Sequence, residues 1–311
     1  MGKASEKYEV IYEIVSSEEN ILNIGDLCTT AGVSRSGYYY WLSTEEDRKL
    51  REEQDKKDFE LILEAYKFKG YAKGIRGIHM RLLHLDEPVL MNTKKIRRLM
   101  HKYNLHCKIR SANPYRRMAK ALKTDSVCDN ILERKFKDYG PRKVLLTDIT
   151  YIPLNDVFCY LSVIKDAYTK QILAYVLSES LEIDFVLETV KMLINNHGIS
   201  LDEETLIHSD QGCHYTSKKF RTIISDCKLR QSMSRKGNCW DNAPQESFFG
   251  HMKDEIGEKI KQCKTFEETK MLIDDWMDYY NNYRYQWELA KLSPNEYYAY
   301  ITTGIYPLKI K

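Results

Sequence analysis

The sequence predicts an α/β fold, a mixed five-stranded sheet with flanking helices, preceded by all-α regions. Residues 143–234 contain short segments rich in β-forming residues, and segments with helical periodicity alternate with the later ones. The first 110 residues show helical patterns and N-cap signals instead. There is no signal peptide and no run of about 18 apolar residues, so we expect no membrane segment and a cytoplasmic location.

Length and charge indicate several folded units and a nucleic-acid partner. The 311 residues exceed the usual size of a single domain. The net charge is only +3, but residues 91–123 contain eleven Lys and Arg and no Asp or Glu. Such a block suits DNA binding, because each cation that meets a phosphate releases a condensed counterion. A solvated helix face is the alternative interpretation.

The N-terminal segment 7–42 predicts a small helix-turn-helix-like unit. A first helix is followed by a turn at Gly32, and Ser34 is a plausible N-cap for a second helix that ends near Leu42. A helical hairpin packed on its own aromatic residues would show the same pattern. Residues 44–57 are crowded with acids and lysines, which indicates an exposed helix start or a hinge.

A second helical group follows, with helices expected around 59–67 and 75–85 and a third one capped by Asn92 or Thr93. The third helix is a candidate recognition helix. Its basic residues are the first candidates for DNA binding: Lys94, Lys95, Arg97, Arg98 and Lys102.

Residues 111–130 predict a basic linker. The periodicity fades here, Asn113-Pro114 breaks any helix, and positive charge continues. We expect the linker to follow the DNA backbone through residues such as Arg116 and Arg117.

The pattern changes to β-strands after residue 143. Three strands of a meander are expected first, followed by a helix, a strand, a second helix and a fifth strand. The corresponding segments are 144–153, 157–166, 171–177, 183–195, 205–209, 217–227 and 230–234. This order, with helices on both faces of a mixed sheet, indicates the ribonuclease-H-like architecture.

Three carboxylates occupy special positions in this order. Asp148 lies within the first strand, where a charge is costly unless it is paired or metal-bound. Asp210 follows the fourth strand, and ligands of open α/β sheets gather beyond strand ends. The first and fourth strands are neighbours in the proposed fold, so the two aspartates can converge. Glu246 projects from the start of a helix for which Asn242 is a good N-cap.

The chemistry of these side chains predicts a metal-dependent site. Three convergent carboxylates without His or Cys favour a hard, oxygen-coordinated cation, Mg²⁺ or Mn²⁺. We expect two ions about 3.5–4 Å apart, which would activate a water or a DNA 3′-hydroxyl and stabilise the leaving oxygen. The predicted reaction is therefore displacement at a phosphodiester.

Further DNA contacts are expected next to Glu246. Lys253 follows it by seven residues on the same helical face, where its ammonium could hold a phosphate. The polar loop before this helix could grip DNA near the cut, although a loop that only packs is the alternative. Its candidates are Lys236, Asn238, Trp240 and Asn242.

The remaining polar and aromatic candidates have ordinary explanations. Turns and caps account for the other acids near the site, which are Asp166, Asp184 and Asp241. His208 and His214 flank Asp210, where they could orient it, contact DNA or only pack. A C-terminal aromatic series with helical spacing predicts a packing stripe rather than a base-stacking surface: Trp276, Tyr279, Tyr280 and Tyr283.

Asp210 and Glu246 are separated by 35 residues, which resembles the Asp-Asp-35-Glu pattern of retroviral integrases and of transposases of the insertion-sequence-three family. The local sequence is more specific than the spacing. LTDITYIP, HSDQGCHYTS, SMSRKGNCWDNAPQESFFGHMKDE and YYNNYRYQWELAKLSPNEYY resemble the second-frame (OrfB) product of that family. SRSGYYYWL, GIRGIHMRLL and TKKIRRLMHKYNL are similar to its N-terminal helical regions. The resemblance covers nearly the whole chain.

The resemblance implies a bacterial DNA transposase with a retroviral-integrase-like catalytic core, in which Asp148, Asp210 and Glu246 are the catalytic and metal-binding residues. It implies cleavage at the element's ends to expose a 3′-hydroxyl, followed by strand transfer, commonly through a circular copy-out intermediate. The expected partners are the terminal inverted repeats, target DNA, further copies of the chain on DNA and the upstream-frame protein. The expected location is the bacterial cytoplasm, on the nucleoid.

We predict five regions and keep two alternative functions. The regions are an N-terminal helical region at 1–50, a second helical DNA-binding region at 51–110, a basic linker at 111–135, the catalytic core at 136–262 and a C-terminal helical region at 263–311. The alternatives are a simple ribonuclease-H-like nuclease and a non-catalytic, transposase-derived DNA-binding regulator. The basic N-terminal half argues against the first, and the three carboxylates argue against the second.

Overall fold

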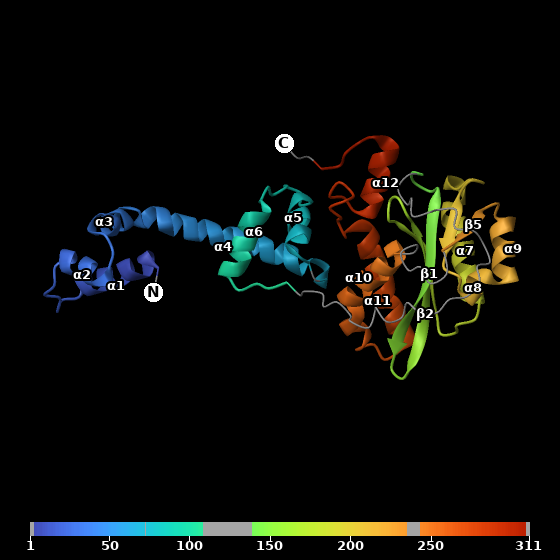
Figure 1. Cartoon of the computed structure of the whole chain (residues 1–311), viewed down its shortest axis with the longest axis horizontal. Helices are drawn as coiled ribbons and strands as arrows, with labels where there is room; N and C mark the ends of the chain where they lie inside the picture. The colour runs from blue at the N-terminus through green and yellow to red at the C-terminus, as the bar shows by residue number, and fades with distance from the viewer. Residues whose placement is uncertain (1–2, 72, 108–138, 235–242, 309–311) are drawn as a thin grey trace.

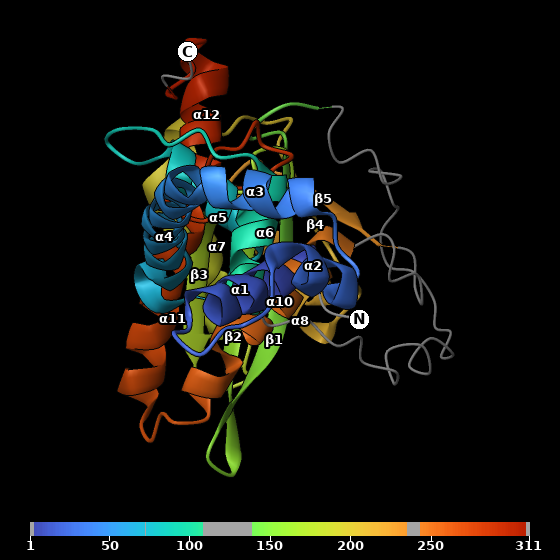
Figure 2. The same ribbon diagram turned by 90° about the vertical axis from the view of Figure 1, so that its left-hand side faces the viewer.

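The computed structural model describes residues 3–71, 73–107, 139–234 and 243–308. Within these ranges the molecule is elongated, with helical units at one end and a sheet with flanking helices at the other (Figure 1). In the view along the long axis, the N-terminal helices lie in front of the sheet domain (Figure 2). Each helix in the described ranges is too short or too polar to span a membrane.

The first unit consists of α1 (Ala4–Ser16), α2 (Ile24–Ala31) and α3 (Arg35–Ser43). The chain turns between α2 and α3 at Gly32, whose φ of 64° is a left-handed conformation that glycine adopts at little cost. Ser34 caps α3, because its hydroxyl oxygen accepts a hydrogen bond from the N–H of Gly37 at 3.0 Å. The predicted helix-turn-helix pattern and its cap are confirmed.

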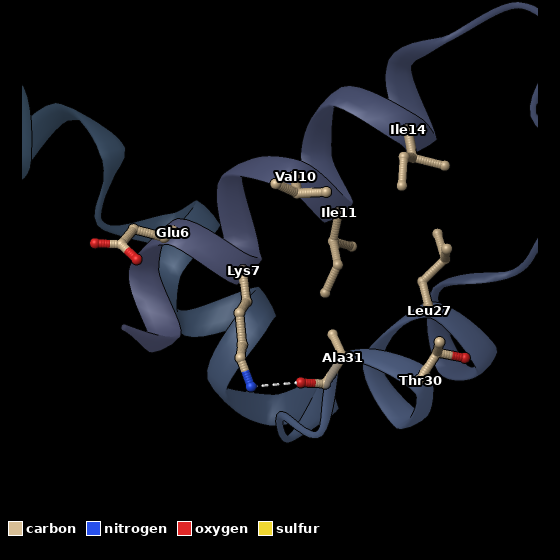
Figure 3. Close-up of a pocket in the computed structure, with 8 residues that line it drawn as sticks. All are labelled: Glu6, Lys7, Val10, Ile11, Ile14, Leu27, Thr30 and Ala31. Carbon is tan, nitrogen blue, oxygen red and sulfur yellow. Dashed lines mark hydrogen bonds between the residues drawn. The ribbon is translucent and has the colours of Figure 1, made fainter. Parts of the chain in front are cut away.

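An apolar groove lies between α1 and α2 (Figure 3). Val10 and Ile11 line it from α1, and Leu27 lines it from α2. At one end the ammonium of Lys7 donates a hydrogen bond to the carbonyl oxygen of Ala31 at 2.7 Å. The groove is open to solvent, since Val10 is exposed.

A single long helix, α4 (Glu45–Lys67), connects the first unit to the second. It contains most of the charged segment that indicated a hinge, and it runs without a break through residue 50, where a boundary was predicted. Glu, Lys, Arg and Gln are strong helix formers, which explains why this polar segment is helical. The second unit also contains the 3₁₀ turn η1 (Phe68–Gly70), α5 (Ile75–Leu83) and α6 (Thr93–Lys102).

The five strands of the sheet have the order β3-β2-β1-β4-β5. The central strand β1 (Val144–Leu154) is antiparallel to β2 (Val157–Asp166), which is antiparallel to β3 (Ile172–Ser178). The short strands β4 (Leu206–Ser209) and β5 (Arg230–Met233) continue the sheet in parallel on the other side of β1. All five predicted strands are confirmed, and so is the contact between the first and fourth.

Helices cover both faces of the sheet (Figure 1). α10 (Ala243–Ile260) and α11 (Phe266–Asn282) pack over the face that carries Ile152 and Val163. α7 (Asp184–His197) and α9 (Lys218–Asp226) pack over the face that carries Leu145 and Ile164. The remaining elements are η3 (Gly198–Ser200), α8 (Cys213–Thr216) and α12 (Pro294–Thr303). This is the predicted ribonuclease-H-like arrangement.

Aromatic side chains join the second helical unit to the C-terminal helices. The ring of Tyr71 lies 4.3 Å from that of Tyr279, centroid to centroid, and the Tyr71 hydroxyl donates a hydrogen bond to Asp275. The ring of His84 stacks on that of Tyr285 at 3.5 Å. The predicted packing stripe is confirmed for its three buried members, Trp276, Tyr279 and Tyr280, whereas Tyr283 is partly exposed at the edge.

Candidate active site at the end of the central strands

Asp148 lies on the face of β1 that α10 covers. It lies on the same face of the strand as Ile152 and pairs with Val163 of β2, and both of these residues belong to the core beneath α10. The carboxylate is half-buried, and its Oδ1 accepts a hydrogen bond from the N–H of Ile149 at 2.8 Å. The strand therefore holds this acid against the sheet, facing the helix that carries Glu246.

The strand register brings Asp210 to the level of Asp148. β1 and β4 run in parallel with Leu146 opposite His208, and the two aspartates each lie two residues further along. Asp210 Oδ1 accepts a hydrogen bond from the N–H of Gly212 at 2.9 Å. A Cβ at Gly212 would lie 3.0 Å from that oxygen, so glycine permits this tight turn beside the carboxylate.

Glu246 lies in the first turn of α10, which begins at Ala243. Phe248, Phe249 and Met252 bury one side of the helix in the core that also contains Ile152 of β1. This packing places α10 over β1, the strand that carries Asp148. Gln245 is fully buried there, and neither polar atom of its amide has a hydrogen-bond partner in the described part of the chain.

The charges of the three acids act on one another. Burial, followed by the negative charge of Asp210 and then that of Glu246, raises the pKa of Asp148 to about 7 in total. Mutual repulsion of this kind is what a cation would relieve. Within the described residues, however, no three side chains among His, Cys, Asp and Glu are already gathered at metal-binding distance.

Lys165, a cation buried beside these acids, was not among the residues predicted from the sequence. It is only 3% exposed on β2, and its Nζ donates a hydrogen bond to the carbonyl oxygen of Pro244 at 2.6 Å. Burial lowers the pKa of Lys165 to about 7, while the negative charge of Asp148 opposes this shift. The bond ties the sheet to the first turn of α10, two residues before Glu246. A charge within an apolar strand was the signal that identified Asp148, and the same signal identifies Lys165.

Lys253 lies on the exposed side of α10, two turns after Glu246. The surrounding protein lowers the pKa of its ammonium, and the negative charge of Asp148 acts in the opposite direction. Lys253 is therefore near enough to the acids for their charges to interact. Its exposure leaves it accessible to a substrate.

The histidines that flank Asp210 have structural partners. His208 is buried on β4, and a ring nitrogen is 3.0 Å from the Ser232 hydroxyl on β5. His214 lies with a ring nitrogen 2.6 Å from the carbonyl oxygen of Leu181. Three roles were open for these two histidines: orienting Asp210, contacting DNA or packing. The contacts described here favour packing.

The basic residues of α6 divide between two faces of the helix. Three of them form ion pairs with acids of α4: Lys95 with Asp58 at 2.5 Å, Arg98 with Asp55 at 2.7 Å, and Lys102 with Asp55 at 2.8 Å. Lys94 and Arg97 are exposed, and neither forms an ion pair within the described ranges. The Asn92 side chain caps the helix by accepting from the N–H of Lys95 at 2.8 Å, as predicted.

Several predicted DNA contacts lie outside the described residues. They are Arg116 and Arg117 of the basic linker and the loop residues Lys236, Asn238, Trp240 and Asn242.

Comparisons with known proteins agree with this architecture. A family model described as integrase core domain matches residues 138–239, and a second model with the same description matches 246–299. A model described as HTH-like domain matches residues 53–113. The two integrase core matches contain Asp148, Asp210 and Glu246, and the HTH-like match contains most of α4 together with α5 and α6.

The chain is similar over nearly its full length to proteins of bacterial insertion sequences. It is 30% identical to the insertion element IS600 uncharacterized 31 kDa protein of Shigella sonnei, over 86% of this chain and 96% of that protein. It is 24% identical to the transposase InsF for insertion sequence IS3A of Escherichia coli (strain K12), over 92% of this chain and 97% of that protein.

Among solved structures, the catalytic core domain of BIV integrase is 14% identical with a TM-score of 0.42, over 53% of this chain and 99% of that chain.

The integrase core and HTH-like matches and the relatives from insertion elements, taken together, identify the family. The chain belongs to the insertion-sequence-three family of transposases, with an integrase core preceded by an HTH-like domain.

Proposed function

We propose that the chain cleaves DNA at the ends of an insertion sequence and joins the exposed 3′-hydroxyl to target DNA, with Asp148, Asp210 and Glu246 as catalytic and metal-binding residues. The observation that supports this most directly is the parallel register of β1 and β4, which brings Asp210 level with Asp148 on the strand that α10 covers. The negative charges of Asp210 and Glu246 both raise the pKa of Asp148, although these two residues come from the end of β4 and from α10. A site that gathers carboxylates beside the central strand is suited to a cation and a phosphodiester.

The donor set fits Mg²⁺ or Mn²⁺, because all three side chains offer hard oxygen ligands. A divalent cation bound to them, or a pair of cations, would supply Lewis-acid polarisation of the scissile phosphate. Two lysines of the chain would position the catalytic helix and the substrate. Lys165 would hold the start of α10 so that Glu246 faces the strands, and Lys253 would hold a phosphate next to the reacting 3′-end.

The wider proposal concerns partners and organisation. We propose the division 1–50, 51–110, 111–135, 136–262 and 263–311, with DNA contacts from α6, the basic linker, the loop before α10 and Lys253. The ligands would be the terminal inverted repeats and target DNA. The chain would act as a homo-oligomer on DNA, with the upstream-frame protein as a partner, in the bacterial cytoplasm on the nucleoid.

The test is a joining assay with a labelled duplex that carries the element's own end, in Mg²⁺ and separately in Mn²⁺. Asp148→Asn, Asp210→Asn and Glu246→Gln should each abolish cleavage and joining while DNA binding persists. Asp226→Asn, an exposed acid at the end of α9, is the control and should remain active. Near-normal activity in any of the three variants would reject the assignment.

The same assay separates the alternative functions. A simple nuclease would cut the duplex in a metal-dependent way but would never join a pre-cleaved end to a second DNA. A non-catalytic regulator would bind the end and do neither.

A further inference from the structure

A positively charged cavity of about 240 Å³ lies between the start of α5 and the end of α11. Four cationic side chains line it, and they come from both the second helical unit and the C-terminal region. They are Lys73, Arg76, Arg81 and Arg284. Among the described residues that line it, Glu255 on α10 contributes the only carboxylate.

The carboxylate of Glu255 is already occupied. It accepts hydrogen bonds from Arg284 Nε at 2.9 Å and from Trp276 Nε1 at 3.0 Å. Arg284 and Glu255 form a mostly buried ion pair at 2.8 Å, so their opposite charges largely offset each other. Three cations remain, and none of them forms an ion pair with a described residue.

The contacts of these three cations are with neutral groups. The guanidinium of Arg81 lies 3.8 Å from the centroid of the Phe68 ring, and that of Arg76 lies 5.3 Å from the centroid of the Trp287 ring. The ammonium of Lys73, which is 8% exposed, donates to the carbonyl oxygens of Phe68 and Tyr71. The side chains are thus fixed in place while their charge is uncompensated.

Burial is the main cause that lowers the pKa of Lys73, to about 8 in total. The negative charge of Glu255 opposes this shift, and the positive charges of Arg81 and Lys259 add to it. An anion in the cavity would raise this pKa.

The backbone adds donors at the same place. Gly74 is the N-cap of α5 and has no side chain to cap the helix, and the first turn contains no acid. A Cβ built at Gly74 would meet nothing within 4 Å, so space is open at this helix end. The N–H groups and the dipole of the first turn favour an anion there.

We propose that this cavity binds one backbone phosphate of a DNA strand that spans the HTH-like domain and the integrase core. This inference rests on the proposed function for its choice of DNA over a free anion. Two exposed aromatic side chains also favour a nucleic acid, since bases and sugars can pack on such rings: Tyr283 in the lining, and Trp287, whose ring contacts Arg76 of the lining. None of the DNA contacts predicted from sequence lies in this cavity.

The test is DNA binding to the full chain without divalent metal, measured by fluorescence anisotropy at several salt concentrations. Gly74→Asp places a carboxylate at the open helix end and also supplies a good N-cap, so the fold should be kept or stabilised. We expect affinity to fall about tenfold and the slope of log K against log salt to become shallower by about 0.9, the value for one phosphate. Gly74→Asn, a neutral cap of the same shape, is the matched control and should bind nearly as wild type. Arg76→Gln should repeat the loss.

Inorganic phosphate is the second probe. If it stabilises the wild type against heat but not Gly74→Asp, while both bind DNA with equal affinity and slope, the cavity takes a free anion and the proposal is overturned. Equal DNA binding by wild type, Gly74→Asp and Arg76→Gln would overturn it as well. The assay contains no metal, so Asp148→Asn, Asp210→Asn and Glu246→Gln should bind DNA with the wild-type slope of log K against log salt. A failure of this site is thereby separated from a failure of the proposed chemistry.

Discussion

Asp148 and Asp166 belong to neighbouring strands and are both withdrawn from solvent, but their surroundings differ. Asp166 is fully buried, and its carboxylate accepts hydrogen bonds from the N–H groups of Arg142, Tyr168 and Thr169 and from the Arg142 guanidinium at 3.1 Å. Asp148 has two other carboxylates acting on it instead. Burial is common to both residues, so the sign of the neighbouring charge is what separates a structural acid from a candidate catalytic one.

The largest effect on stability is expected for Asp166→Asn. The substitution leaves Arg142, which is 6% exposed, as a buried cation without its partner, and this should cost about 3–5 kcal/mol. Asp148→Asn should leave the free energy of unfolding unchanged or raise it, because it removes one of three repelling charges. Urea denaturation with an unchanged m-value measures both. Equal losses in the two variants would contradict the distinction.

Lys165→Met tests whether the buried lysine positions Glu246. An apolar side chain of similar length avoids the cost of burying an ammonium, so the free energy of unfolding should change by less than about 1 kcal/mol. Joining of pre-cleaved ends should fall about 10²-fold, because the start of α10 loses its bond to the sheet and small misplacements are costly. Lys165→Arg keeps a donor and should recover part of the rate. A Met variant that joins DNA at the wild-type rate would show that the bond has no positioning role.

Lys253→Ala should have a smaller effect, confined to one reaction. We expect joining to fall about tenfold while metal-dependent nicking of non-specific DNA is unchanged, since only joining must align a 3′-end with a second DNA. Lys261→Ala, an exposed lysine just beyond the end of the same helix, is the control. Equal activity of Lys253→Ala and wild type in joining would assign this lysine to solvation of the helix.

The two faces of α6 provide the smallest effects. Arg98→Ala should destabilise the second helical unit by about 1 kcal/mol with little change in the salt dependence of DNA binding, because Arg98 is paired with Asp55. Replacing Lys94 and Arg97 with Ala should leave stability unchanged and make the salt slope shallower by about 1.8, for two phosphates. The reverse result would mean that the paired face contacts DNA.

The pairing on α6 also predicts a pH dependence. Hydrogen bonds from Arg98, followed by those from Lys102, hold the pKa of Asp55 well below its usual range. The folded pKa is therefore lower than the unfolded value of about 3.9, so the stabilisation is complete above that pH and is lost as the pH falls. The stability difference between wild type and Arg98→Ala should accordingly shrink on acidification. A difference that stays constant down to about pH 2 would contradict the pairing.

The strands could be predicted from the sequence because each one is marked by its own residues and by the turns beside it. β1, β2 and β3 each showed the β-forming residues and turns that define a strand, and the neighbouring positions of β1 and β4 followed from the fold class. The pairing of Lys95, Arg98 and Lys102 could not be predicted in this way, because the partner acids lie about 40 residues earlier in α4. Residues 91–123 contain no acid, but in the structure the acids of α4 lie beside α6. The cavity beside α5 was missed for the same reason, since residues from α5, α10 and the end of α11 form it together.

The most direct test of the central claim is to measure binding of Mn²⁺ to the protein without DNA, by electron paramagnetic resonance or calorimetry. The account predicts that the wild type binds the ion and that Asp148→Asn, Asp210→Asn and Glu246→Gln each weaken this binding by more than about tenfold, since each removes a charged ligand. Asp226→Asn should bind as wild type. If the three variants bind Mn²⁺ as tightly as the wild type does, Asp148, Asp210 and Glu246 do not form one metal site.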